Sequence, residues 1–167
     1  MVEIIVRGHR NKVYQLALSR DTEYVASIDS INTILSHKAK TGIMEYRADN
    51  AFAGTVTGLC YLPNGSLVAC GWGYDVSGGN GLKVFSPSLE LVQTLVGHEY
   101  AASCVTVSPS GSHIASGDGY RKVMIWSESG DGGEWAGVQE LEDHTNCIMA
   151  VCFSPDGKQL ATGSYDK

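Results

Sequence analysis

The sequence GHEYAASCVTVSPSGSHIASGDGYRKVMIW, residues 97–126, contains the pattern from which the architecture of this chain can be worked out. A Gly-His pair opens it, and a run of small and β-branched residues leads to the turn Ser108-Pro109-Ser110-Gly111. A second run, with Ala115 and Ser116, follows the turn, and a third ends in Trp126. Pro at the second turn position and Gly at the fourth favour a type I turn between paired strands. The segment therefore predicts short antiparallel strands with tight connections.

The same pattern recurs along the chain in a common register. The second residues of the corresponding turns, spaced by 43, 46 and 46 positions, are Arg20, Pro63, Pro109 and Pro155. Eleven residues before them lie His9, Phe52, His98 and His144. Six residues after them lie Ala26, Ala69, Ala115 and Ala161. A repeat of this length built from strands is typical of four-stranded propeller blades.

Short strands are predicted on both sides of each turn. The strands before the turns are expected at 13–18, 56–61, 102–107 and 147–153, and those after them at 24–28, 66–70, 113–116 and 159–162. Third strands are expected at 33–36, 82–85 and 123–126, and fourth strands at 44–47, 91–95 and 138–141. A further strand at 3–7 would be the last strand of a preceding unit.

The charge balance limits the classes of partner. With 12 Lys and Arg against 18 Asp and Glu, the 167-residue chain has a formal net charge of −6 at pH 7. A nucleic-acid groove or a site for an anionic membrane needs a cluster of Lys and Arg, which this sequence lacks. We therefore expect neither nucleic acid nor a membrane as the partner.

The compartment is predicted from apolar runs and cysteines. Only three consecutive apolar residues precede Arg7, too few for the core of a signal peptide, and no run approaches the ~18 apolar residues of a membrane span. Five cysteines without a Cys-x-x-Cys motif favour reduced thiols and a cytoplasmic protein. Cys60, Cys70 and Cys152 occupy strand positions that we expect to be buried.

These repeats resemble the WD-repeat family of β-propellers over essentially the whole chain. The segments that carry the resemblance are Gly8-His9, Gly97-His98, Ile125-Trp126, Asp143-His144 and Gly163-Ser164-Tyr165-Asp166. The resemblance implies an all-β partial propeller of about 3.5 four-stranded antiparallel blades. Residues 1–8 would belong to a preceding blade, residues 9–51, 52–97 and 98–143 would form three blades, and residues 144–167 would begin another. The remainder of the ring, or another chain, would have to close it.

The resemblance also implies a buried polar network of His, Ser or Thr, Asp and Trp in each blade. The family pattern places Asp five and Trp eleven residues after the repeated Ala. The fourth unit matches with His144, Thr162 and Asp166. The third unit has His98, Ser116 and Trp126, but Tyr120 stands at the Asp position and Asp118 comes two residues early.

The first two units depart further from this pattern. The first has His9 and Ser27, but Ile31 and His37 stand at the Asp and Trp positions, so a complete network is not predicted there. The second has Phe52, Cys70, Tyr74 and Phe85 at the four positions. Apolar packing is predicted in its place, because exchanging all partners of a polar network together costs little.

Strand alternation predicts where partners would bind. The loops that enter each blade and the turns between second and third strands lie on one face. The exposed candidates there are Asn11, Lys12, Trp72, Tyr74, Tyr100, Tyr120, Arg121 and Tyr165. Trp72 could instead fold back over the edge of its blade. On the opposite face, residues 127–134 are expected to form a solvated loop.

The function implied by the resemblance is a non-catalytic scaffold that binds protein or peptide partners, with no cofactor, no metal and no catalytic residue. Short strings such as Lys40-Thr41-Gly42 and Val56-Thr57-Gly58-Leu59 also look similar to actin-interacting propellers that act with cofilin in filament disassembly. An alternative of another class is a metal-dependent propeller hydrolase. That alternative needs acidic and amide side chains on the inner strands, where Leu16, Leu59 and Val105 stand instead.

Overall fold

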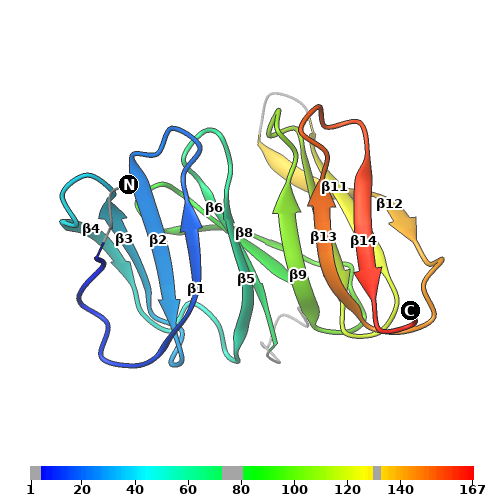
Figure 1. Ribbon diagram of the computed structural model, residues 1–167, viewed down its shortest axis with the longest axis horizontal. Coiled ribbons are helices and arrows are strands. Elements are labelled where there is room, and N and C mark those ends of the chain that lie inside the picture. The colour runs from blue at the N-terminus through cyan, green and yellow to red at the C-terminus, as the bar shows by residue number, and fades with distance from the viewer. Residues whose placement is uncertain (1–4, 73–80, 130–132) are drawn as a thin grey trace.

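The computed structural model describes residues 5–72, 81–129 and 133–167, and its regular structure consists of β-strands. These ranges contain no helix of the length and apolarity that crossing a membrane requires. The strands form sheets that stand side by side in chain order (Figure 1). The predicted all-β architecture is thus confirmed.

Three four-stranded antiparallel sheets are followed by a two-stranded one. The first sheet consists of β1 (Val13–Leu18), β2 (Tyr24–Asp29), β3 (Ile34–Lys38) and β4 (Met44–Ala48). The second consists of β5 (Val56–Tyr61), β6 (Leu67–Gly71), β7 (Leu82–Phe85) and β8 (Leu91–Leu95). The third consists of β9 (Ala102–Val107), β10 (His113–Asp118), β11 (Val123–Ser129) and β12 (Glu134–Leu141). The fourth contains β13 (Ile148–Phe153) and β14 (Leu160–Ser164).

The first strand of each sheet packs beside the first strand of the next, so β1, β5, β9 and β13 form one edge of the assembly. A break in register marks the start of each of these strands, and the unpaired residues there are Tyr14, Thr57, Ser103 and Met149. Two of these residues connect neighbouring sheets. The Thr57 hydroxyl donates to the Ala102 carbonyl at 2.8 Å, and the Ser103 hydroxyl donates to the Ile148 carbonyl.

Two apolar clusters fill the spaces between the three complete sheets. The cluster between the first and second sheets includes Ile28, Phe52 and Phe85, and the two phenylalanine rings lie 6.4 Å apart. The cluster between the second and third sheets includes Cys70 and Trp126. Phe52, Cys70 and Phe85, which replace the polar members of the repeat in the second unit, are all buried.

The structure corrects the prediction of an opening strand at 3–7. Residues 3 and 4 lie outside the described residues, and residues 5–7 are not in a strand. Among the described residues, no sheet includes this segment. Instead the segment lies against the first sheet, where His37 Nε2 donates to the Arg7 carbonyl at 2.7 Å.

The loop predicted at 127–134 is also shorter in the structure than expected. β11 runs to Ser129 and β12 begins at Glu134, and these two residues face each other in the sheet; residues 130–132 lie outside the described residues. The side-chain amide of Gln93 explains the extension, because it bonds both the N–H and the carbonyl of Trp135 at 2.8 Å. This contact fixes the start of β12 against the second sheet.

Candidate functional site

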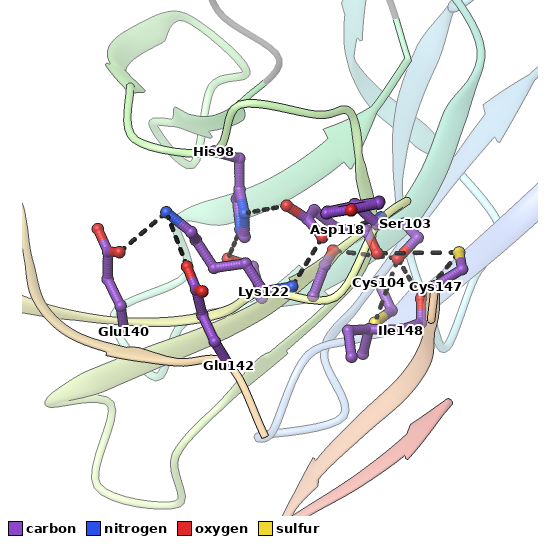
Figure 2. Close-up of polar contacts among 12 residues, drawn as sticks. His98, Ser103, Cys104, Asp118, Lys122, Glu140, Glu142, Cys147 and Ile148 are labelled. Carbon is purple, nitrogen blue, oxygen red and sulfur yellow. Dashed lines mark hydrogen bonds and ion pairs between the residues drawn. The ribbon is translucent and has the colours of Figure 1, made fainter. Parts of the chain in front are cut away.

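A buried polar network lies inside the third sheet. The Ser116 hydroxyl accepts a hydrogen bond from the Trp126 indole N–H at 2.8 Å and lies 2.7 Å from His98 Nε2. The other ring nitrogen of His98 is 3.5 Å from a carboxylate oxygen of Asp118 (Figure 2). Ser116, His98 and Asp118 are all buried, so this network belongs to the interior of the protein.

Asp118 also holds the turn between β10 and β11. One carboxylate oxygen accepts hydrogen bonds from the backbone N–H groups of Tyr120 and Lys122, each at 3.0 Å. Burial raises the pKa of Asp118, but bonding to His98 and to these two amides outweighs it and leaves the pKa below the ordinary 3.8. The sequence pattern put the Asp position at Tyr120. Because the turn begins at Asp118, Tyr120 lies at its tip.

The first sheet contains a network that joins the predicted His9 and Ser27 to Asp29, which the sequence did not predict. His9 lies 3.1 Å from Asp29 and 2.7 Å from the Ser27 hydroxyl. Asp29 was missed because the expected spacing pointed to Ile31. Asp29 follows its repeated Ala by three residues, as Asp118 does, so comparing these two units with each other could have found it.

The network of the two-stranded sheet joins the residues that its sequence pattern named. His144 lies 3.0 Å from Asp166 and 2.8 Å from the Thr162 hydroxyl, and Asp166 accepts a hydrogen bond from the Thr145 amide at 2.7 Å. The amide of Thr145 contributes most to lowering the pKa of Asp166. The His144 side chain is 26% exposed, against 0% for His98, so this network is more open to solvent than the network of the third sheet.

Three of the residues predicted to bind partners form one exposed group, which we call the tyrosine stack. The rings of Tyr100 and Tyr120 are stacked with centroids 4.8 Å apart, and the Arg121 guanidinium lies 5.4 Å from the Tyr120 centroid. Arg121 also approaches Glu142 at 3.4 Å. Next to the stack, Lys122 pairs with Glu140 at 2.9 Å and Glu142 at 3.5 Å (Figure 2). The stack is therefore already assembled in the absence of a partner.

The other predicted contact residues lie on loops outside the stack. Trp72 and Tyr165 are 55% and 65% exposed, and Asn11 and Lys12 are also exposed. Tyr74 lies outside the described residues. Within the described ranges, no hydrogen bond or ring contact joins these residues to Tyr100, Tyr120 or Arg121.

Three cysteines that are at least partly buried have thiols that are not activated. Burial raises the pKa of Cys70 to about 12 and also raises the pKa of Cys60 and Cys104, so these groups stay protonated and unreactive. The prediction that Cys152 is buried is wrong, because its side chain is exposed on β13, and in the described residues no sheet follows β13 and β14 to cover it. Across the described residues, no three His, Cys, Asp or Glu side chains converge as a metal site would require.

A family model described as "WD domain, G-beta repeat" matches residues 89–127 and 135–167. A relative in Sclerotinia sclerotiorum, "Probable cytosolic iron-sulfur protein assembly protein 1", is 42% identical over 77 residues, which cover 43% of this chain and 17% of the relative. "Probable cytosolic Fe-S cluster assembly factor" of Schizosaccharomyces japonicus is 25% identical over 206 aligned residues, with 98% of this chain and 34% of the relative covered. "Protein CIA1" of Arabidopsis thaliana is 34% identical over 95 residues, which cover 51% of this chain and 27% of the relative. The chain thus spans about a third or less of the length of these relatives.

Proposed function

Because the chain belongs to the WD-repeat family of β-propellers, we propose that it is a non-catalytic scaffold whose loop face binds other proteins. The observation that carries this proposal is the tyrosine stack, in which two exposed aromatic rings lie together, Asp118 bonds the backbone of Tyr120, and Arg121 pairs with Glu142. Tyr, Trp and Arg are the residues that most often dominate the energetics of protein interfaces. A preformed group also loses little side-chain entropy on binding.

The blades 9–51, 52–97 and 98–143 would be successive units of a larger ring, to which residues 144–167 contribute half a blade. In that ring, the loop face would present Trp72, Tyr74, Tyr165, Asn11 and Lys12 around the tyrosine stack. Partners that span several blades would contact residues far apart in the sequence.

The partners would be proteins that take part in the assembly of cytosolic iron–sulfur proteins, the role that the names of two relatives describe. Two of the relatives carry names that describe assembly of cytosolic iron–sulfur proteins or clusters, and this supports a cytosolic assembly role. The actin-interacting alternative gains no such support, since none of the relatives described above is named for actin or cofilin. A hydrolase is disfavoured by the exposed apolar side chains of Leu16 and Leu18 on the first inner strand.

Affinity capture from cytosol with the purified chain as bait tests this function. Wild-type protein is expected to retain iron–sulfur assembly proteins, and the change Arg121→Ala or Trp72→Ala is expected to weaken binding of the retained protein by about 2 kcal/mol. Titration of that protein against each variant measures the change.

Two matched variants serve as controls. Arg47→Ala removes another exposed Arg, which lies on β4 and is ion-paired with Asp49 at 2.7 Å. Ser129→Ala alters the face opposite the loop face. Both are expected to bind as the wild type does. Retention that depends on Arg47 or Ser129, and not on Arg121 or Trp72, would refute the assignment of the loop face.

A further inference from the structure

The face opposite the tyrosine stack carries a groove that the proposed function does not use. The turns that follow the first strands of the sheets, β1, β5, β9 and β13, lie on this face. The turn that joins β13 to β14 is seen at the upper edge of Figure 1. A shallow hollow runs across these turns, lined by Arg20, Tyr61, Pro63, Val107, Pro109 and Pro155. We call it the turn groove.

Successive turns pack closely at the floor of the turn groove. A Cβ on Gly111 would lie 2.6 Å from Pro63 Cδ, and a Cβ on Gly157 would lie 3.3 Å from Pro109 Cδ. Both glycines have positive φ, at 79° and 72°, which L-residues with side chains rarely adopt. Pro63 and Pro109 are therefore each seated on the Gly of the next turn, so the apolar surface runs from one turn to the next.

Arg20 is the only charged residue among those that line the turn groove. It occupies the turn position at which the other three units have Pro. Its neighbour Asp21 is bonded to the Ser19 hydroxyl at 2.6 Å and the Glu23 amide at 2.9 Å. In the part of the chain that the structure describes, Arg20 is exposed and has no ion pair.

We propose that the turn groove is a second docking site, which takes an extended acidic segment of a protein partner. A carboxylate of the segment would pair with Arg20, and the apolar side chain beside it would pack on Pro63 and Pro109. The charge supports this choice of occupant, because a guanidinium beside an apolar surface matches a carboxylate flanked by an apolar residue. A second hollow, between the first two turns, shares Arg20 and Pro63 but is also lined by Asp21, so a residue of the segment that continues there would be uncharged.

NMR titration of the 15N-labelled chain with the peptide acetyl-Gly-Glu-Leu-Leu-Gly-amide tests this proposal. Saturable shifts are expected at the amides of Gly65, Gly111 and Gly157, which lie in the three Gly-containing turns. Replacing the Glu of the peptide by Gln, or changing Arg20→Gln, is expected to weaken binding at least about tenfold, as loss of a charge-assisted hydrogen bond does.

The controls separate this site from the loop face. Lys158→Gln removes another exposed cation from the same face without altering the groove lining, and Arg121→Ala alters the tyrosine stack; neither is expected to change peptide affinity. Equal binding of the Glu and Gln peptides, shifts centred on Gly119 of the loop face, or no saturable shift would overturn the proposal.

Discussion

Asp118 connects the buried network of the third sheet to the exposed tyrosine stack, because one carboxylate bonds on both sides. Its contact with His98 lies in the interior, and its bonds to the amides of Tyr120 and Lys122 shape the turn at the surface. A change in the interior of this sheet is therefore expected to alter the position of the Tyr120 ring.

Removing His98 is expected to cost more stability than removing His144. Loss of the imidazole removes the hydrogen bond at the buried Ser116 hydroxyl and the charge contact at the buried Asp118 carboxylate, at ~1–3 kcal/mol for a buried site. His144 is partly exposed, so water replaces part of what His144→Ala removes. Urea unfolding of His98→Ala and His144→Ala measures both losses, with exposed His113→Ala as control; equal stability of His98→Ala and wild type would contradict the network.

Stability is expected to fall in acid because of three carboxylates. The pKa values of Asp29, Asp118 and Asp166 are lowered in the folded protein, so each group stabilises the fold above the ordinary pKa of 3.8 and loses this contribution as the pH falls through its folded pKa. Asp118→Asn is expected to unfold more easily at pH 7 and to show a smaller further loss below pH 3.8. Urea midpoints measured from pH 7 to pH 3 test this, and an unchanged slope would refute it.

At the scale of strands, the bounds predicted from the sequence are most accurate for strands that flank the Pro- and Gly-containing turns. Pro63, Pro109 and Pro155 with the glycines two residues later located the inner pairs of strands within about two residues of their observed ends. The start of β12 was missed because it depends on Gln93, 42 residues away in sequence, which no local pattern reveals. The opening strand was predicted from its position alone, without a neighbouring strand to pair with it.

Glycines between the sheets set how closely the sheets approach. A Cβ on Gly117 would lie 2.6 Å from Ile148 Cβ, across the contact between β10 and β13, and 3.0 Å from Cys104 Sγ on the neighbouring strand β9. Gly117→Ala is expected to destabilise the protein by ~1–3 kcal/mol through overpacking. In the control variant Gly163→Ala, the new Cβ has its nearest contact at 3.8 Å, and a small effect is expected. Thermal unfolding compares the two, and similar midpoints would contradict this account.

At the scale of the whole molecule, both ends of the row of sheets present uncovered surface. Tyr14, Leu16 and Leu18 on β1 are each more than half exposed, and the outer edge of β14 has no neighbouring strand in the described residues. Exposed apolar faces and open strand edges are sites of association.

The 167-residue chain on its own is therefore expected to self-associate. Size-exclusion chromatography with light scattering measures its mass, and the double change Leu16→Lys and Leu18→Lys is expected to shift it towards the monomer. Ile43→Lys replaces an equally exposed residue in an outer turn and serves as the control. A wild-type chain that is monomeric and unfolds in one sharp transition would contradict this expectation.

The hydroxyl bridges from Thr57 and Ser103 have a kinetic consequence. Backbone hydrogen bonds join strands within each sheet, whereas neighbouring sheets in the described residues share only side-chain packing and side-chain bonds such as these two. Local opening in such an array proceeds unit by unit. Amide protons of β5–β8, covered on both sides, should exchange with deuterium last, and those of β13–β14 first. A partner bound across two sheets would then slow deuterium uptake in both sheets together.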